Sequence, residues 1–197
     1  TLTVTNPANG CTATSSVNVT QNITPPNVNA GAPQVLSCSV TSINLNGSSS
    51  TAGATFSWAG PGIVSGGTTA SPTVDQAGTY ILTMTDPANG CTATANTTVT
   101  NDLGLPNASA GAAQILNCSV TSVVLGGSSS TGGATFSWAG PGIVSGGTSA
   151  TPTVNQPGAY TITVTDPSNG CTSTSNVNVT QNITPPNANA GATQILT

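Results

Sequence analysis

The chain contains no lysine, arginine or histidine, and its only charged side chains are four acidic residues among 197, for a formal net charge of −4. Binding to nucleic acid requires cationic side chains that displace counterions from phosphates, so this class of function is excluded. A patch for anionic membranes is excluded for the same reason. Most catalytic sites use a histidine or a lysine, and the serine, threonine and cysteine side chains have no such base to activate them. The sequence therefore predicts a protein that is not an enzyme.

Aromatic residues are also scarce, at 3%, and no run of about 18 apolar residues occurs, so we expect no insertion into a membrane. The sequence does not open on a signal peptide. Its first residues, TLTVTNPANGC, resemble the middle of a strand-and-turn unit, which suggests a window from a longer protein. A hydrophobic share of 36% with little charge is not the composition of a disordered chain. A folded chain is therefore expected.

An internal repeat of 80 residues organises the sequence, and the segment GATFSWAGPGIVSGGT occurs twice. The residues that recur at this spacing are Cys11, Cys91 and Cys171, Cys38 and Cys118, Trp58 and Trp138, and Tyr80 and Tyr160. A period of this length is that of a domain. We predict the end of one repeat over 1–24, complete repeats over 25–104 and 105–184, and the first strand of another over 185–197. Prolines at the joints should stiffen short connections, which predicts an extended array.

Within a repeat, apolar residues alternate with Thr, Ser and Asn at a period of two, as in half-buried strands. Strands are predicted over 30–37, 40–46, 55–58, near 63, 72–75, 79–85 and 92–100. Short strands separated by Gly- and Pro-rich turns predict an all-β fold of tandem immunoglobulin-like β-sandwich domains. The predicted core residues are Phe56, Trp58, Tyr80, Phe136, Trp138 and Tyr160. The alternative role for the tryptophans is to stack on sugars. The tyrosines resemble tyrosine corners, which is a structural role.

The runs AGTYILTMTDPANGCTAT and GAYTITVTDPSNGCTST, preceded by NAGAPQVLSC and SAGAAQILNC, resemble the PKD-like and SprB-type repeats of Bacteroidota surface proteins. Two features depart from these families: Trp58 is followed by Ala-Gly-Pro-Gly instead of the PKD pattern, and no C-terminal secretion domain lies within this window of sequence. The resemblance implies Ig-like domains in exported, cell-surface adhesins of the gliding-motility type.

The function implied is a structural segment of a long extracellular stalk, adhesin or filament. The alternative is an adhesive module that binds a glycan or a protein through loops such as GPGIVSGG.

Five cysteines are present, and neither a CxxC pair nor a histidine accompanies them as a zinc site would need. Export favours disulfides over free thiols. Each complete repeat holds one pair, which predicts bonds from Cys38 to Cys91 and from Cys118 to Cys171, with Cys11 paired outside the sequence. The alternative is a bond from Cys38 to Cys171, in which the bottom of one domain meets the top of the next.

Other sites have weaker signals. Asp86 with Asn89, and Asp166 with Asn169, could offer oxygen atoms to calcium, although one carboxylate per loop is few, and we predict no metal or cofactor. Sequons occur at Asn18, Asn22, Asn46, Asn96, Asn107, Asn117, Asn178 and Asn182. The predicted partners are neighbouring repeats, identical chains joined through weakly charged edge strands into a filament, and surface glycans.

Overall fold

The computed structural model describes residues 1–195, and every regular element in that range is a β-strand. None of these residues forms a helix of the length and hydrophobicity needed to cross a membrane. In chain order the strands are β1 (Leu2–Thr5), β2 (Thr12–Ser15), β3 (Gln34–Ser37), β4 (Ile43–Asn44), β5 (Thr55–Ala59), β6 (Ile63–Ser65), β7 (Thr73–Val74), β8 (Gly78–Thr85), β9 (Thr92–Asp102), β10 (Gln114–Asn117), β11 (Val123–Val124), β12 (Thr135–Ala139), β13 (Ile143–Ser145), β14 (Thr153–Val154), β15 (Gly158–Thr165) and β16 (Thr172–Asn182).

The chain divides into two compact units. The first comprises Thr1–Gln34 and Ser42–Val99, and the second comprises Val35–Thr41 and Thr100–Thr197. The short segment Val35–Thr41 thus packs with the second unit, although it lies inside the sequence repeat 25–104.

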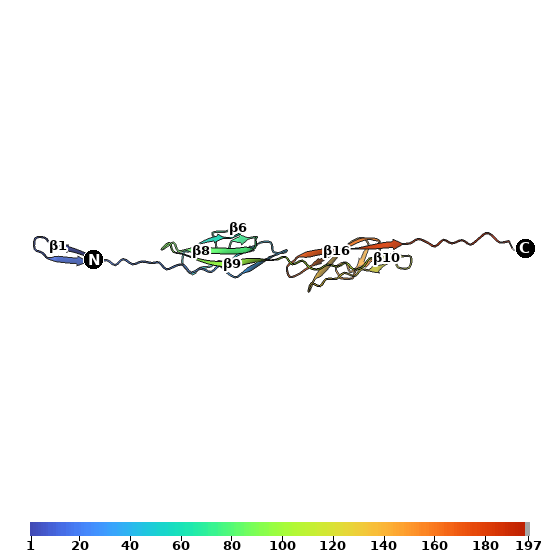
Figure 1. The fold of residues 1–197 in the computed structure, drawn as a ribbon, viewed down its shortest axis with the longest axis horizontal. Helices are drawn as coiled ribbons and strands as arrows, with labels where there is room; N and C mark the ends of the chain where they lie inside the picture. Colours follow the sequence, from blue (N-terminus) through green and yellow to red (C-terminus); the bar gives the residue numbers. More distant parts are fainter. Residues whose placement is uncertain (196–197) are drawn as a thin grey trace. The chain divides into compact units, whose positions relative to one another are not determined.

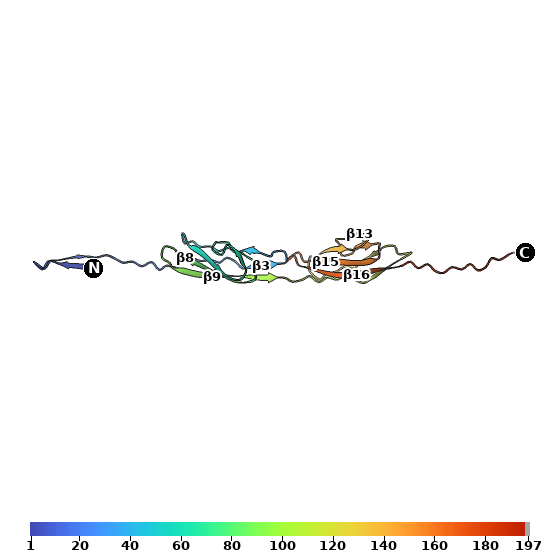
Figure 2. The same ribbon diagram turned by 90° about the horizontal axis from the view of Figure 1, so that it is seen from above.

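Each complete repeat forms one four-stranded and one three-stranded sheet. The strand orders are β3-β9-β8-β5 and β4-β7-β6 in the earlier repeat, and β10-β16-β15-β12 and β11-β14-β13 in the later one. Figure 1 shows β6 on the opposite layer from β8 and β9, and Figure 2 shows β13 similarly apart from β15 and β16. In the later repeat neighbouring strands are antiparallel, except that β10 runs parallel to β16. This order, with the first strand beside the last, is that of an immunoglobulin-like sandwich, which confirms the predicted fold.

The core of the second unit lies between its two sheets. Val154 of β14 and Leu125, which directly follows β11, pack with Tyr160, Ile162 and Val164 of β15, and all five are fully buried. Alternate residues of β15 point inward because successive side chains of a strand lie on opposite faces of the sheet. The sequence pattern Tyr-x-Ile-x-Val therefore becomes one wall of the core.

The six predicted core residues do not share one degree of burial. Trp58, Tyr80, Trp138 and Tyr160 are buried, whereas Phe56 and Phe136 are half-buried at the margin of the core. The Trp58 indole donates to the Thr69 carbonyl at 3.0 Å, and the Trp138 indole donates to Ser149 at the same distance. These rings are packed inside the sandwich and are not presented for stacking on a sugar.

The N-terminal hairpin of β1 and β2 corresponds to the turn region of β8 and β9 and pairs Leu2 with Ser15 through Thr5 with Thr12. Its Leu2 and Val4 are exposed, whereas the residues 80 positions later, Leu82 and Met84, are fully buried. The hairpin therefore repeats part of the sequence of β8 and β9, the two central strands of their sheet, without the layer that covers them in the complete repeat.

Candidate functional site

The turn between β15 and β16, residues 166–171, is held by its own side chains. Asp166 Oδ1 accepts from the Ser168 N–H at 2.9 Å, and Asn169 Oδ1 accepts from the Cys171 N–H at 2.9 Å. The Gly170 N–H donates to the Asp166 carbonyl at 2.8 Å, and Gly170 has a φ of 73°, in the left-handed region. Asx residues and glycine fix this conformation through local bonds. The turn therefore presents Asn169 and Cys171 in a defined geometry.

Four residues of the second unit receive this turn, and we call Cys38, Ser39, Asp102 and Gly104 the seat. The Ser39 N–H donates to the Asn169 carbonyl at 3.1 Å, and the Ser39 hydroxyl donates to the same oxygen at 3.2 Å. Asn169 Nδ2 donates in turn to Asp102 Oδ1 at 3.1 Å and to the Gly104 carbonyl at 2.9 Å. The amide and the carbonyl of Asn169 are thus both satisfied, which suits a side chain that is almost fully buried.

A disulfide joins Cys38 of the seat to Cys171 of the turn, with 5.0 Å between the two Cα atoms. Cys171 is fully buried. Gly170 lies directly against Ser39: a Cβ at position 170 would be 2.5 Å from the Ser39 Cβ. A larger residue at 170 would therefore push the turn out of its seat.

The structure corrects the preferred disulfide pairing, because Cys38 bonds to Cys171 and neither Cys38–Cys91 nor Cys118–Cys171 forms. The reason is the parallel alignment of β10 with β16, in which Asn117 lies beside Asn182 at the far end of β16. Cys171 precedes the first residue of that 11-residue strand. Two cysteines of one repeat therefore lie about 35 Å apart along the strand. A disulfide needs Cα atoms within about 7 Å, so the bond must link different repeats.

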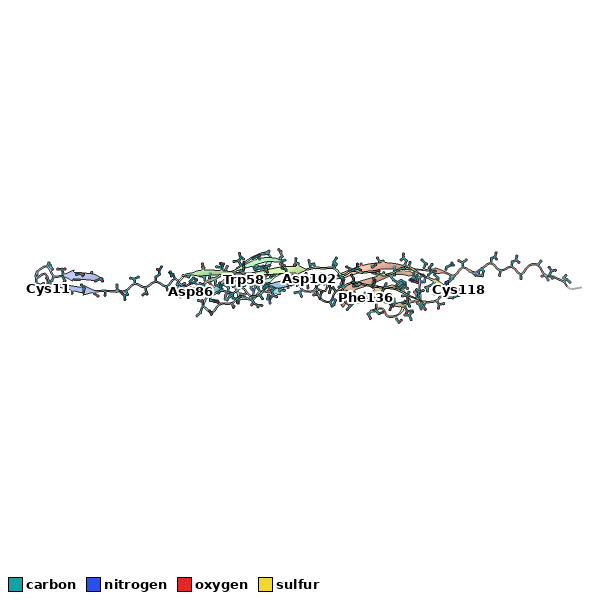
Figure 3. The ribbon with its side chains drawn as sticks, turned by 60° about the horizontal axis from the view of Figure 1, so that its bottom comes forward. Cys11, Trp58, Asp86, Asp102, Cys118 and Phe136 are labelled. Atoms are coloured by element: carbon teal, nitrogen blue, oxygen red, sulfur yellow. A yellow bond between two sulfur atoms is a disulfide. The ribbon has the colours of Figure 1, made fainter. Side chains whose placement is uncertain are left out.

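The remaining cysteines, Cys11, Cys91 and Cys118, are free thiols in residues 1–195. Cys11 and Cys118 are exposed and Cys91 is half-buried. Cys11 lies at the turn between β1 and β2, and Figure 3 labels it together with Cys118 and Asp102. A partner for Cys11 outside the sequence stays a prediction.

The carboxylates considered for calcium are engaged in their turns. Asp166 Oδ1 accepts from both the backbone and the hydroxyl of Ser168, the latter at 2.6 Å, and these bonds lower the pKa of Asp166 below its ordinary value. Asp86 Oδ1 accepts from the Ala88 N–H at 2.8 Å. No group of three metal-ligating side chains occurs within residues 1–195. That no metal binds at these turns stays a prediction.

The tyrosine corners are present in both repeats. The Tyr80 hydroxyl donates to the carbonyls of Pro61 and Gln76, and the Tyr160 hydroxyl donates to those of Pro141 and Gln156. Pro61 belongs to the loop GPGIVSGG, so this loop is fixed at its base to β8. Burial raises the pKa of both hydroxyls.

Sequence reasoning missed three of the four seat residues. Ser39, Asp102 and Gly104 are separated in the chain and carry no motif of their own. The one available signal was that Asn-Gly-Cys recurs at 9–11, 89–91 and 169–171, always with the asparagine two residues before the cysteine. That spacing identifies the turn, but it does not identify what the turn contacts.

No family model matches the sequence, and no curated protein matches it. Among solved structures, the I-band fragment I67–I69 from titin is similar with 14% identity and a TM-score of 0.38, over 82% of this chain and 67% of that one. The three N-terminal domains of the bacteriophage RB49 Hoc capsid protein give 14% identity and a TM-score of 0.45, over 80% and 58%. Extracellular domains 3–5 of Drosophila OTK give 10% and 0.36, over 81% and 63%. The fold assignment rests on the strand order above: this chain is a segment of tandem Ig-like domains.

Proposed function

We propose that this chain is a structural segment of an extracellular stalk, adhesin or filament at a cell surface, in which disulfides carry tension from one repeat to the next. The observation that supports this role is the Cys38–Cys171 bond. Cys38 belongs to the sequence repeat 25–104 and Cys171 to the repeat 105–184, so the bond crosses the boundary between repeats at a sequence separation of 133.

The bond changes the covalent path that a pulling force follows. Tension applied to the two ends of the chain passes along residues 1–38, crosses the sulfur–sulfur bond and continues from Cys171 to the end. Strands β4 to β15 all lie within the loop that the bond closes. Strands β4 to β15 are therefore shielded from a load that would otherwise pull them apart, whereas β3 and β16 remain in its path, and such shielding is the property that a load-bearing stalk requires.

The chemistry of the bond supports an extracellular location, since disulfides persist in oxidising compartments and are reduced in the cytosol. The composition also supports an extracellular location. A chain with no lysine or arginine offers no cleavage site to trypsin-like proteases, and Thr, Ser and Asn keep its surface hydrated without charge. The gliding-motility type of adhesin suggested by the repeats agrees with this role.

Single-molecule pulling tests the proposal. The variant with Cys11, Cys91 and Cys118 all changed to Ser keeps only the Cys38–Cys171 bond and is held at its two ends. The 133-residue loop should stay closed under oxidising conditions and open after reduction, adding about 450 Å of contour length. The matched control adds Cys38→Ser and should give the full length with or without reductant. Equal lengths in the first variant before and after reduction would contradict the load path.

A further inference from the structure

An asparagine followed directly by glycine is a chemically labile pair, because the glycine nitrogen can attack the side-chain carbonyl carbon of the asparagine and no Cβ on the glycine hinders it. Of the asparagines in such pairs within residues 1–195, only Asn169 is almost fully buried. The pairs lie at 9–10, 46–47, 89–90 and 169–170. The reactivity of Asn169 therefore depends on whether the seat around it is closed.

Bonds within the turn hold the reacting atoms of this pair apart. The Gly170 N–H donates to the Asp166 carbonyl at 2.8 Å, so the attacking nitrogen is engaged. Asn169 Oδ1 accepts from the Cys171 N–H at 2.9 Å, which fixes the side chain in an Asx turn. Attack requires the Asn169 side chain to rotate toward the Gly170 nitrogen, and this rotation breaks both bonds.

The seat adds a second set of bonds that the reaction would have to break. Asn169 Nδ2 donates to Asp102 Oδ1 at 3.1 Å and to the Gly104 carbonyl at 2.9 Å. The Asn169 carbonyl accepts from the N–H and the hydroxyl of Ser39. A side chain held at every polar atom and excluded from water cannot rotate without opening the seat. The closed seat therefore protects Asn169.

The disulfide from Cys171 to Cys38 keeps the turn in the seat, since Cys171 lies only two residues after Asn169. A small thiol can reduce this bond: two thiol molecules are oxidised to their disulfide, and the two cysteines become thiols. Hydrogen bonds alone then hold the turn. Local segments open more often when they have fewer restraints, so reduction exposes Asn169 for a larger fraction of the time.

We propose that Asn169 is a modification site, guarded by the Cys38–Cys171 bond, that deamidates when the seat opens. The Gly170 nitrogen loses its proton and attacks Asn169 Cγ, a cyclic imide forms, and the side-chain nitrogen takes up a proton and leaves as ammonia. A water molecule then opens the imide at either carbonyl carbon and gives aspartate or isoaspartate. The net reaction is the hydrolysis of an amide, in which water enters and ammonia leaves.

The product does not fit the seat that the asparagine has left. Asp102 Oδ1 and the Gly104 carbonyl both accept from Asn169 Nδ2, and a carboxylate at this position has no N–H to offer them. Its negative charge would also face the Asp102 carboxylate at close range. Isoaspartate adds a carbon to the backbone of the turn and so displaces Cys171 from Cys38. Deamidation therefore keeps an opened seat from closing again.

The charge at Asp102 makes this junction sensitive to the modification. The positions 80 residues before and after it carry Asn22 and Asn182. An asparagine at 102 could turn its own amide toward a carboxylate at 169 and donate to it, whereas an ionised aspartate only accepts. Replacing Asp102 by asparagine should therefore relieve the effect of deamidation.

This modification goes beyond the proposed load-bearing role and does not depend on it. The unaltered chain is incubated at mildly alkaline pH with and without a small thiol, and its thiols are then blocked. Mass spectrometry after broad-specificity proteolysis measures aspartate and isoaspartate in the peptide that contains DPSNG, a segment that occurs once. The thiol should raise the rate of deamidation at Asn169 by about tenfold or more. Equal rates with and without the thiol would overturn the proposal.

Asn46 supplies an internal control, because the Gly47 N–H donates to the Ala70 carbonyl and all three residues belong to the first unit. Its rate should not respond to the thiol, and a parallel rise at Asn46 would show general unfolding instead of opening of the seat. Cys38→Ser should deamidate at Asn169 at the raised rate without any thiol. Cys118→Ser is the matched variant and should keep the slow rate of the unaltered chain.

A second experiment tests whether the product keeps the seat open. Asn169→Asp reproduces the aspartate product, and each variant is reduced, freed of thiol and reoxidised with glutathione disulfide. Peptide mapping should recover the Cys38–Cys171 bond about tenfold less often in Asn169→Asp than in the unaltered chain. Asp102→Asn alone should re-form the bond normally, and Asp102→Asn combined with Asn169→Asp should recover it. A double variant as defective as Asn169→Asp would show that charge at Asp102 is not the cause.

Discussion

At the scale of single residues, one buried position carries a polar side chain in the earlier repeat and an apolar one in the later repeat. Thr97 lies opposite Tyr80 across β8 and β9, and Val177 lies opposite Tyr160 across β15 and β16. Both side chains are buried, but the Thr97 hydroxyl has no hydrogen-bond partner among residues 1–195. A buried hydroxyl without a partner loses its bonds to water and gains nothing in return.

Thr97→Val should therefore stabilise the earlier repeat by about 1 kcal/mol, since it removes the unpaired hydroxyl and keeps the shape of the side chain. The reciprocal change, Val177→Thr, places a hydroxyl at the equivalent site and should destabilise the later repeat by about 1–2 kcal/mol. Urea unfolding of both variants against the unaltered chain measures the two effects. A loss of stability in Thr97→Val would show that the hydroxyl is satisfied by water in solution.

The tyrosine corners predict sensitivity to alkaline pH. Burial raises the pKa of Tyr80, with the Asp75 carboxylate adding to the effect, and burial likewise raises the pKa of Tyr160. The folded state thus holds the hydroxyl proton more tightly than the unfolded state, whose pKa is about 10. This stabilisation is complete below about pH 10 and is lost as the pH rises through the folded pKa values.

Tyrosinate absorbance against pH measures the effect directly, because these are the only two tyrosines of the chain. The folded protein should titrate above the urea-unfolded protein, and unfolding should accompany the titration. Tyr160→Phe should remove one titrating group and leave the other raised. Superimposable curves for the folded and unfolded protein would contradict the prediction.

At the scale of elements, the alternation of apolar and polar residues was enough to locate the strands. Residues 79–85 were predicted and β8 spans Gly78–Thr85, and 92–100 was predicted for β9, which spans Thr92–Asp102. The predicted and observed strand bounds agree less well where the backbone hydrogen bonds depart from regular strand pairing. Residues 40–46 were predicted as one strand, but β4 contains only Ile43–Asn44, and Leu45 and Gly47 donate to the Pro72 and Ala70 carbonyls outside regular pairing.

The position of the first strand could not be predicted from its sequence. Gln114–Asn117 shows the same alternation whichever edge it joins, and its parallel pairing with β16 depends on residues about 65 positions away. The period gives the buried face, with Leu116 inside and Ile115 outside, but it gives neither the partner strand nor the direction. Register of this kind is set by tertiary packing.

At the scale of the whole molecule, the disulfide pairing depends on that same alignment. The sequence left the bond from Cys38 to Cys171 as the alternative to one pair in each repeat, and the parallel alignment of β10 with β16 decides for it, because the two cysteines of one repeat lie at opposite ends of a long strand. The turn could be recognised from its Asx and Gly residues, whereas Ser39, Asp102 and Gly104 become a seat only when the segment Val35–Thr41 joins the second unit.

The stability of the chain should reflect the length of the loop that the bond closes. In the chain-entropy model, closing a loop of 133 residues stabilises the folded state by about 5 kcal/mol. Cys38→Ser should lower the free energy of unfolding by up to about this amount. Cys118→Ser, which alters a cysteine at the equivalent position without a bond, should change it by less than about 0.5 kcal/mol.

Calorimetry with and without reductant measures both variants and separates the bond from its surroundings. Reductant should lower the transition of the unaltered chain and of Cys118→Ser to that of Cys38→Ser, which should not respond. The seat keeps its hydrogen bonds from Asn169 to Asp102 and Gly104 after reduction, so Asn169→Ala should destabilise Cys38→Ser further. A transition of the unaltered chain that is indifferent to reductant would mean that the hydrogen bonds of the seat, and not the disulfide, hold the segment in place.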